Sequence, residues 1–376
     1  HRHRVCRRQR QRRIIDSLEI GEHAVCGSPL LGNGDVVRGS AQHTAWPSHA
    51  LLNSISGLAR AGEVLSVAVK RGLTMQDHVT THQAEEDARN NEILIYLNGQ
   101  IVPKAQAVVS VYDSGFMLGD GIWEGLRLYD GCWAFMDEHF DRLFEAAKAI
   151  DIDIGMTRET LISALLETQK TNGMTTDAHA RLMITRGVKT RPFQHPSLSQ
   201  SGPTITIIME HSRPSIPRPI RLATVPHLRG LPMTQDPKLN SHSKLNCILA
   251  CIAAEKAGAD EALMLDINGF VNTTNACNFF IVRKGAVWTS TGDYCMNGIT
   301  RQKVIDLCRA NDIPVFERNF SLVDTYGADE AFLTGTFGAQ TPVASIDGRQ
   351  IGTGEMGPMT QRLRDLYKDL IKQEAA

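Results

Sequence analysis

The sequence lacks the features that mark several classes of protein. Its 40 basic and 41 acidic residues leave a net charge of −1, which gives no general electrostatic basis for binding nucleic acid or an anionic membrane surface. No run of eighteen apolar residues occurs, so no segment is predicted to span a bilayer. The eight cysteines form no CxxC pair and no His/Cys cluster at metal spacing. We therefore expect reduced thiols, no metal site and a cytoplasmic location.

The remaining composition is that of an ordinary globular protein. A chain of 376 residues is long enough for two or three domains with hydrophobic cores. Its hydrophobic fraction of 42% and charged fraction of 22% exclude a disordered or fibrous chain.

The first residues differ from this average. Residues 1–13 contain seven arginines and no acid, and the stretch to residue 74 shows neither helical nor strand periodicity. We interpret residues 1–92 as a leader that is disordered or spuriously translated, and we leave it out of the fold argument. The alternative is that residues 1–74 are a transit peptide that directs the protein to an organelle.

Hydrophobic periodicity after the leader predicts strands and helices in alternation. Asn98-Gly99 separates two apolar runs from residue 93 onward and predicts a β-hairpin, and Asp130-Gly131 predicts another turn. Residues 138–150, with Asp137 as the N-cap, and residues 157–171 repeat apolar side chains at helical spacing. The remaining predicted strands are 107–112, 122–129, 181–185, 204–209, 220–225, 262–266, 279–282 and 330–333, and the remaining predicted helices are 244–257, 301–311 and 359–372.

These elements predict an α+β fold in two domains. Residues 93–188 form a small N-terminal α+β domain, and residues 204–376 form a large C-terminal domain that carries the site. Residues 189–203 are rich in Pro, Ser and Gln and are interpreted as the interdomain loop.

Four motifs, taken in order, resemble the class IV aminotransferases, which are pyridoxal 5'-phosphate (PLP) enzymes of fold type IV. They are Asp113-Ser-Gly-Phe-Met-Leu-Gly-Asp-Gly-Ile-Trp-Glu-Gly-Leu-Arg127, Glu138-His-Phe-Asp-Arg142, Gly298-Ile-Thr-Arg301 and Thr334-Gly-Thr-Phe-Gly-Ala-Gln-Thr-Pro-Val343. The family includes the branched-chain and D-amino-acid aminotransferases and aminodeoxychorismate lyase. The resemblance implies a homodimer in which each subunit holds the cofactor between its two domains.

The resemblance also assigns residues to the cofactor and the substrates. It implies that Arg142 and the backbone amides of Ile299 and Thr300 bind the phosphate, with the turn at Thr336 adding donors. For the substrates it implies Arg127 and Arg181, whose planar guanidinium groups suit carboxylates, together with Phe337 and Gly338. The arginine pair and the apolar Met117, Leu118 and Phe337 favour a hydrophobic substrate side chain, with a dicarboxylate as the other substrate.

The lysine that forms a Schiff base with PLP in this family is replaced here. Alignment without gaps from Asp236-Pro237 places Asn240 at its position, and an amide cannot form an imine. Three alternatives stay open: Lys244, one helical turn later, is the tether; no lysine bonds the cofactor covalently; or Lys238 is the tether. We prefer Lys244, because many relatives carry a tyrosine there whose hydroxyl bonds the cofactor oxygen next to the reactive carbon.

A second departure concerns the pyridine nitrogen. The glutamate that keeps this nitrogen protonated in relatives is replaced by Thr273, whose neutral hydroxyl predicts a weaker electron sink. The sequence therefore predicts a PLP-dependent aminotransferase that acts on an amino acid and a 2-oxo acid. The alternatives are a PLP-dependent lyase or racemase of the same fold and a non-catalytic PLP-binding protein.

Overall fold

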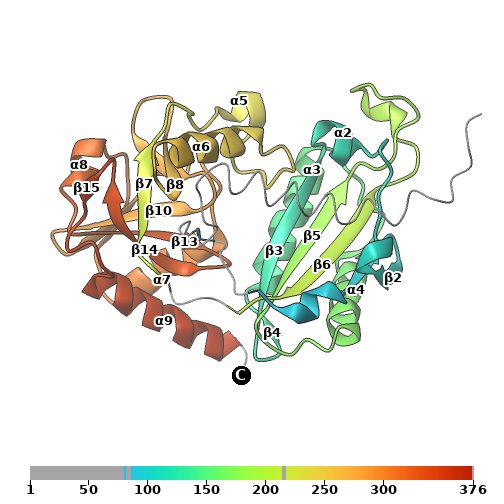
Figure 1. Cartoon of the computed structure of the whole chain (residues 1–376), viewed down its shortest axis with the longest axis horizontal. Coiled ribbons are helices and arrows are strands. Elements are labelled where there is room, and N and C mark those ends of the chain that lie inside the picture. The colour runs from blue at the N-terminus through green and yellow to red at the C-terminus, as the bar shows by residue number, and fades with distance from the viewer. Residues whose placement is uncertain (1–79, 82–85, 214–216, 375–376) are drawn as a thin grey trace, which may run out of the picture. The chain divides into compact units, whose positions relative to one another are not determined.

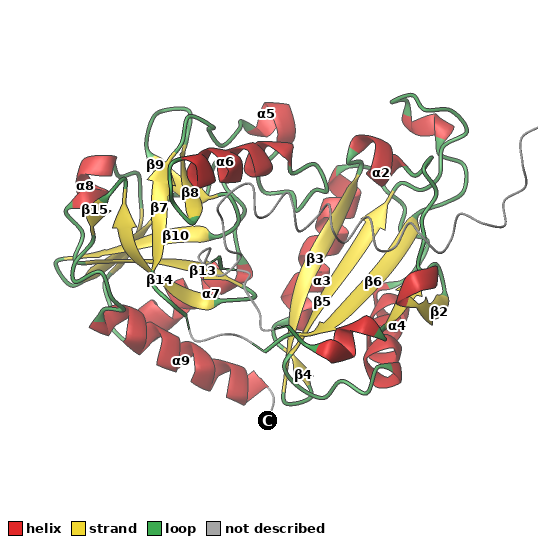
Figure 2. Ribbon diagram, in the orientation of Figure 1, coloured by secondary structure: helices red, strands yellow, loops and turns green. Residues whose placement is uncertain are grey.

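The computed structural model describes residues 80–81, 86–213 and 217–374. Most of the predicted leader therefore lies outside the described residues; Ala88–Asn91, within it, forms a 3-10 turn, η1. The described chain contains two β-sheets, each with helices packed on it (Figures 1 and 2). This arrangement confirms the predicted α+β class.

The first sheet has six strands, and every neighbouring pair is antiparallel. Their order across the sheet is β2-β1-β6-β5-β3-β4. The strands are β1 Leu94–Leu97, β2 Gln100–Pro103, β3 Gly121–Tyr129, β4 Cys132–Trp133, β5 Ala178–Thr185 and β6 Thr204–His211. Helix α3, Met136–Ala149, packs on β3, and α4, Arg158–Thr171, packs on β1 and β6 (Figure 1). The apolar faces of both helices are thereby removed from water.

Strand β6 belongs to the first sheet, although it follows the predicted interdomain loop in the sequence. β6 pairs along its whole length with β5, from Ala178↔His211 to Thr185↔Thr204. Residues 189–203 therefore connect two strands of one sheet, and the chain passes to the second sheet only between His211 and Ile220. A Pro-rich loop between two apolar runs looks the same in the sequence whether it joins two strands of one sheet or two domains. The local sequence does not show which strands pair.

The second sheet closes on itself. Its strand order is β12-β11-β10-β13-β14-β7-β8-β9, and β9 also pairs with β10 through Asn278↔Thr273. The pairs β14–β7, β7–β8 and β11–β12 are parallel. The strands are β7 Ile220–Thr224, β8 Glu261–Leu265, β9 Val271–Thr274, β10 Asn278–Arg283, β11 Ala286–Thr289, β12 Val315–Glu317, β13 Glu330–Gly335, β14 Ala339–Ile346 and β15 Arg349–Gln350.

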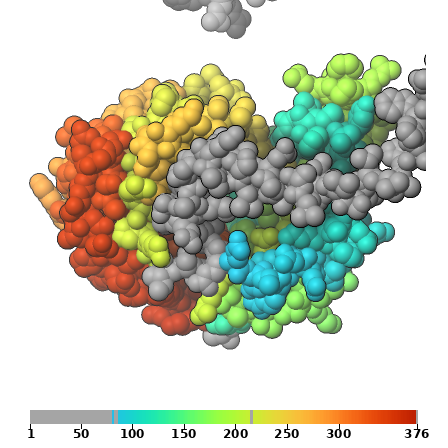
Figure 3. Space-filling view, in the orientation of Figure 1, coloured from blue at the N-terminus to red at the C-terminus, as the bar shows by residue number. Residues whose placement is uncertain are grey.

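Three long helices pack against this second sheet. Helix α6, Leu245–Lys256, contacts β7 and β8; α7, Ile299–Ala310, contacts β13; and α9, Pro358–Glu374, contacts β13 and β14. In the space-filling view the last elements of the chain, in red, form one continuous surface (Figure 3). The short helices of the described chain are η2 Lys104–Gln106, α2 Ser114–Leu118, η3 Pro196–Leu198, α5 Pro232–Gln235 and α8 Leu322–Tyr326. No helix of the described residues is long and apolar enough to cross a membrane.

Most predicted elements are confirmed to within a few residues. The hairpin turns at Asn98-Gly99, where both residues have positive φ (49° and 89°), as a tight type I′ turn requires. The strand predicted over 107–112 is wrong: residues 107–110 have no regular secondary structure, residues 111–112 form a turn, and the segment is largely exposed. Asp137 lies in the first turn of α3, whose N-cap is Phe135.

Stacked aromatic rings join β10 to β13 in the core of the second sheet. Phe280 and Phe332 are both fully buried, with ring centroids 5.0 Å apart and planes 7° apart. We predict that Phe280→Ala lowers the free energy of unfolding by about 3–5 kcal/mol, because it removes buried area and leaves a cavity. Urea unfolding followed by circular dichroism measures this. Phe316→Ala, at a half-exposed ring, is the control; equal losses for the two variants would contradict the prediction.

Candidate active site

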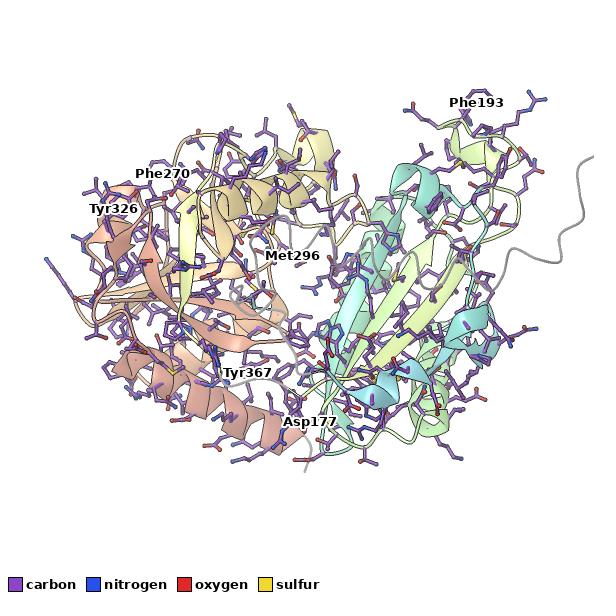
Figure 4. All side chains as sticks on the ribbon, viewed as in Figure 1. Asp177, Phe193, Phe270, Met296, Tyr326 and Tyr367 are labelled. Carbon is purple, nitrogen blue, oxygen red and sulfur yellow. The ribbon has the colours of Figure 1, made fainter. Side chains whose placement is uncertain are left out.

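One pocket brings together all six residues predicted to bind the cofactor. Arg142, Asn240, Thr273, Ile299, Thr300 and Thr336 line it. They come from α3, from the segment before α6, from β9, from the start of α7 and from the turn after β13. Met296, labelled in Figure 4, also lines the pocket. Residues separated by almost 200 positions in the sequence therefore contribute to one cavity.

The N-terminus of α7 supplies backbone donors at this pocket. Its N-cap is Gly298, which has no side chain to satisfy the first amides of the helix. A Cβ on Gly298 would lie 2.3 Å from Oδ1 of Asn278, whose Nδ2 donates to the Met296 carbonyl at 2.9 Å. Only glycine fits at the cap, so the amides of Ile299 and Thr300 remain available for an anion.

A buried carboxylate fixes the arginine of the pocket. Nε and Nη2 of Arg142 each donate to Glu124 at 2.7 Å, and Nδ1 of His139 contacts the same carboxylate at 2.7 Å. Glu124 and His139 are each 1% exposed. Burial by itself would raise the pKa of Glu124, but Arg142 and His139 outweigh it and hold the pKa below its usual value. The third nitrogen, Nη1, points toward the Asn297 carbonyl at 3.4 Å.

Asn240 is fixed because its segment pairs with an edge of the first sheet. The Trp123 amide donates to the Asn240 carbonyl and the His242 amide donates to the Gly121 carbonyl, both at 2.9 Å, and Ile122 and Ser241 form a β-bridge. The Asn240 side chain is 4% exposed, and its Oδ1 has no hydrogen-bond partner among the described residues. An unsatisfied buried amide oxygen is costly, so a ligand donor in this pocket would stabilise it.

Two buried threonines face the same pocket with different hydrogen-bonding capacity. The Thr273 hydroxyl donates to the Cys277 carbonyl at 2.6 Å. A carbonyl only accepts, so the proton of Thr273 is already used and its oxygen can only accept from a ligand. The Thr334 hydroxyl, 2% exposed, has no partner among the described residues and lines the pocket. It can still donate to a bound anion.

Lys244 lies beside this pocket and lines a neighbouring cavity. That cavity is formed with Arg229, Asn246 and Cys247, and Nζ of Lys244 is 5.7 Å from the ring centroid of Trp123, which does line the first pocket. Burial, together with nearby arginines, lowers the pKa of Lys244 from 10.5 to about 8. Lys238 is exposed and lines neither cavity.

The predicted substrate residues lie close to the pocket without lining it. Arg127 is fully buried, donates to the backbone and hydroxyl oxygens of Ser212, and has its guanidinium carbon 4.8 Å from the Phe337 ring centroid. Arg181 lies 3.9 Å above the Trp123 ring centroid. Burial lowers the pKa of both arginines. Within the described chain neither forms an ion pair with an acid, so both have unused capacity for a carboxylate.

Sequence reasoning missed several residues that shape the site. Trp123 and Thr334 line the pocket, Glu124 holds Arg142, and His139 contacts Glu124. Each of these residues lies inside one of the family motifs, so the motifs could have pointed to it. The role of each residue depends on contacts between different helices and strands, which the motifs do not show. In the described part of the chain no group of three or more His, Cys, Asp or Glu side chains could hold a metal ion.

Comparison with known proteins agrees with this geometry. Residues 121–346 match the family described as amino-transferase class IV. The chain is 41% identical over 283 residues to branched-chain-amino-acid aminotransferase-like protein 2 of Arabidopsis thaliana, covering 75% of this chain and 51% of that protein. It is 32% identical over 286 residues to D-alanine aminotransferase of Staphylococcus haemolyticus, covering 75% and 99%. The chain thus spans about half the length of the first of these relatives and nearly all of the second.

A solved structure shows the same relationship. The branched-chain amino acid aminotransferase from Thermobaculum terrenum, in its PLP-bound holo-form, superposes with a TM-score of 0.67 at 26% identity, covering 76% of this chain and 95% of that one. The predicted fold type IV architecture is therefore confirmed. The matched segment of the family contains strand β3, the helix that carries Arg142, the start of α7 and the turn at Thr336. On these findings the chain belongs to the class IV aminotransferase family.

Proposed function

We propose that this protein is a PLP-dependent aminotransferase of the branched-chain type, which transfers an amino group between an amino acid and a 2-oxo acid. One observation carries the proposal: an uncapped helix N-terminus, an arginine held by a buried acid, and buried threonine hydroxyls converge on one pocket. Such a set of donors suits a phosphate dianion. Membership of the class IV family supports the same reading.

The phosphate end of PLP fits the residues present. The amides of Ile299 and Thr300, the Thr334 hydroxyl, the turn at Thr336 and Arg142 would hold it. Because Glu124 occupies Nε and Nη2 of Arg142, the arginine would meet the phosphate with its remaining nitrogen. Its guanidinium cannot rotate away without breaking a buried ion pair, which preorganises the donor.

The other end of the cofactor meets a poorer set of groups. When bound, PLP supplies an electron-accepting ring that stabilises negative charge on the substrate Cα. Thr273 offers the ring only an accepting oxygen, and a neutral oxygen holds a proton on a ring nitrogen less firmly than a carboxylate does. Asn240 offers an amide and no amine.

We propose Lys244 as the amine that holds the cofactor and carries protons. Its lowered pKa, about 8, leaves a substantial neutral fraction at slightly alkaline pH, and a neutral amine is the nucleophilic form. Its position against Trp123 puts it next to the pocket. Arg127 and Arg181 are proposed to bind substrate carboxylates, with Phe337 and Gly338 shaping the space beside them; two such arginines suit a dicarboxylate as one of the two substrates.

A second candidate function is non-catalytic PLP binding. It is favoured by one observation: no lysine is among the residues that line the pocket within the described chain. The phosphate would then be held as described, and the transfer chemistry would be absent. The mapping experiment below separates the two candidates.

We also propose that the chain forms a homodimer and is located in the cytoplasm. An apolar surface on α6 supports the dimer: Leu245, Ile248, Leu249 and Ile252 are between 40% and 66% exposed, and an exposed apolar row of this kind marks an association surface. Sedimentation would show the dimer. The residues on which an organellar alternative depends, 1–74, lie outside the described residues.

Borohydride reduction in the presence of PLP should attach a pyridoxyl group to Lys244. Mass mapping of peptides from the full chain locates the label. The label should be lost in Lys244→Ala and retained in Lys256→Ala, an exposed lysine at the end of the same helix. A label on Lys238 would contradict the assignment, and PLP that binds without any label would favour the second candidate.

Replacing Arg142 should weaken PLP binding, and it should also lower the free energy of unfolding, because it leaves the buried Glu124 carboxylate without its cation. We predict that Arg142→Gln raises the dissociation constant for PLP by roughly 10- to 100-fold, the usual effect of losing a hydrogen bond between charged groups. Arg158→Gln removes an arginine that pairs with Asp137 and Asp141 on the surface and is the matched control. Equal PLP affinity in the Arg142 variant and the wild type would rule out this phosphate site.

The pKa of Lys244 predicts a pH dependence for its reactivity. In the folded protein its reaction with an acylating reagent should reach half its maximum near pH 8, against about 10.5 when unfolded. Between these values only the unfolded state binds the proton, so the contribution of Lys244 to the free energy of unfolding rises with pH across this window. Competitive labelling with mass detection measures the reactivity. A half-maximum near 10.5 in the folded protein would contradict the buried environment.

A further inference from the structure

Residues ahead of the family-matched segment contact the wall of the pocket. Thr81 precedes residues 121–346, is 5% exposed, and contacts the second sheet through Glu261 of β8. Its backbone amide donates to Glu261 Oε1 at 2.9 Å, and its hydroxyl donates to the same oxygen. A Cβ on Gly338 would lie 3.1 Å from the Thr81 carbonyl oxygen, so the lack of a side chain there accommodates this segment.

Thr81 belongs to a closed ring of hydrogen bonds. The Thr274 hydroxyl lies 3.2 Å from the other carboxylate oxygen of Glu261, Oε2, and 3.1 Å from the Cys277 carbonyl oxygen. The carbonyl already accepts from the Thr273 hydroxyl and the Thr274 amide, so we assign the single proton of the Thr274 hydroxyl to Oε2. The Thr274 oxygen accepts from the Cys277 amide at 2.8 Å. The Cys277 thiol then donates to the Thr81 hydroxyl at 3.4 Å, which closes the ring. The ring consists of two chains of hydrogen bonds that start at Cys277 and converge on Glu261. Because each hydroxyl accepts one bond and donates the next, the bonds of each chain polarise one another toward the carboxylate.

The protonation state of the Cys277 thiol is consistent with these directions. Burial and the nearby Glu261 raise the pKa of the Cys277 thiol far above its usual value, so the thiol keeps the proton that it donates. Glu261 is 2% exposed, and its hydrogen bonds come from the neutral donors of Thr81 and Thr274. A buried carboxylate that loses its donors is strongly destabilised. Loss of Thr81 would leave Oε1 without either of these donors.

Two residues that belong to the ring or lie next to it line the pocket. Cys277 lines it directly, and Thr273, next to Thr274, lines it and bonds the Cys277 carbonyl. We propose that Thr81 is a positioning residue for the pocket, acting through Glu261 and Thr274 to hold the turn from Thr273 to Cys277. The effect on PLP affinity rests on the proposed function; the effect on the turn does not.

Hydrogen exchange in the full chain without PLP tests the ring directly. In Thr81→Val, which keeps the amide and removes the hydroxyl, the Cys277 amide should exchange roughly tenfold faster, because local opening costs less. Thr81→Ser should restore slow exchange. Unchanged exchange in both Thr81→Val and Thr81→Ala, the second variant, would overturn the ring.

Titration with PLP tests the positioning role. The dissociation constant should rise about 3- to 10-fold in Thr81→Val, the size expected for one weakened contact, and should stay near the wild-type value in Thr81→Ser. Faster exchange with unchanged PLP affinity would show that the ring holds the turn and does not position the pocket, and would overturn the proposal. If the wild type binds no PLP, the proposed function fails together with the positioning role, whereas the exchange result still reports on the ring.

Discussion

The pocket depends on a short stretch of backbone pairing between the segment before α6 and the edge of β3. Residues 240–242 lie in the sequence between β7 of the second sheet and helix α6. They form backbone hydrogen bonds and a β-bridge with Gly121, Ile122 and Trp123 of the first sheet. Backbone hydrogen bonds are directional, so this pairing fixes both the position and the facing of Asn240. The residues of both sheets that line the pocket are held against each other by this contact.

The pocket offers different chemical groups to the two ends of a cofactor of this family. At one end there are several hydrogen-bond donors in fixed positions. They are the first backbone amides of α7, which no side chain caps, the buried Thr334 hydroxyl and Arg142, which Glu124 holds. At the other end the described lining residues offer the Asn240 amide and the Thr273 hydroxyl, and they include no amine and no carboxylate. Anion binding needs only the first set, whereas group transfer also needs a mobile proton and a charge partner. Binding and catalysis are therefore separable properties in this chain.

Periodicity and motifs predicted much of the fold and the site, because these signals are local. Helix α3 was visible in the spacing of Phe140, Leu143 and Ala147, and the hairpin in Asn98-Gly99. The family motifs named six residues that do share one pocket. The segment 107–112 failed because apolar composition without a pairing partner does not make a strand. The substrate roles of Arg127 and Arg181 stay predictions: neither arginine is among the residues that line the pocket, and Arg181 packs against the Trp123 ring.

The sequence by itself determined the family and most of the strands and helices, since each is a matter of residue type and order along the chain. From the same order it predicts the substitutions at Asn240 and Thr273. Tertiary structure alone decided that β6 belongs to the first sheet, that Lys244 faces a neighbouring cavity, and that Thr81 reaches Glu261 across 180 positions. The physical reason is that hydrogen bonds and burial act over a few ångströms in space. A contact between two residues far apart in the sequence forms only in the folded chain, so the sequence around each residue does not predict it.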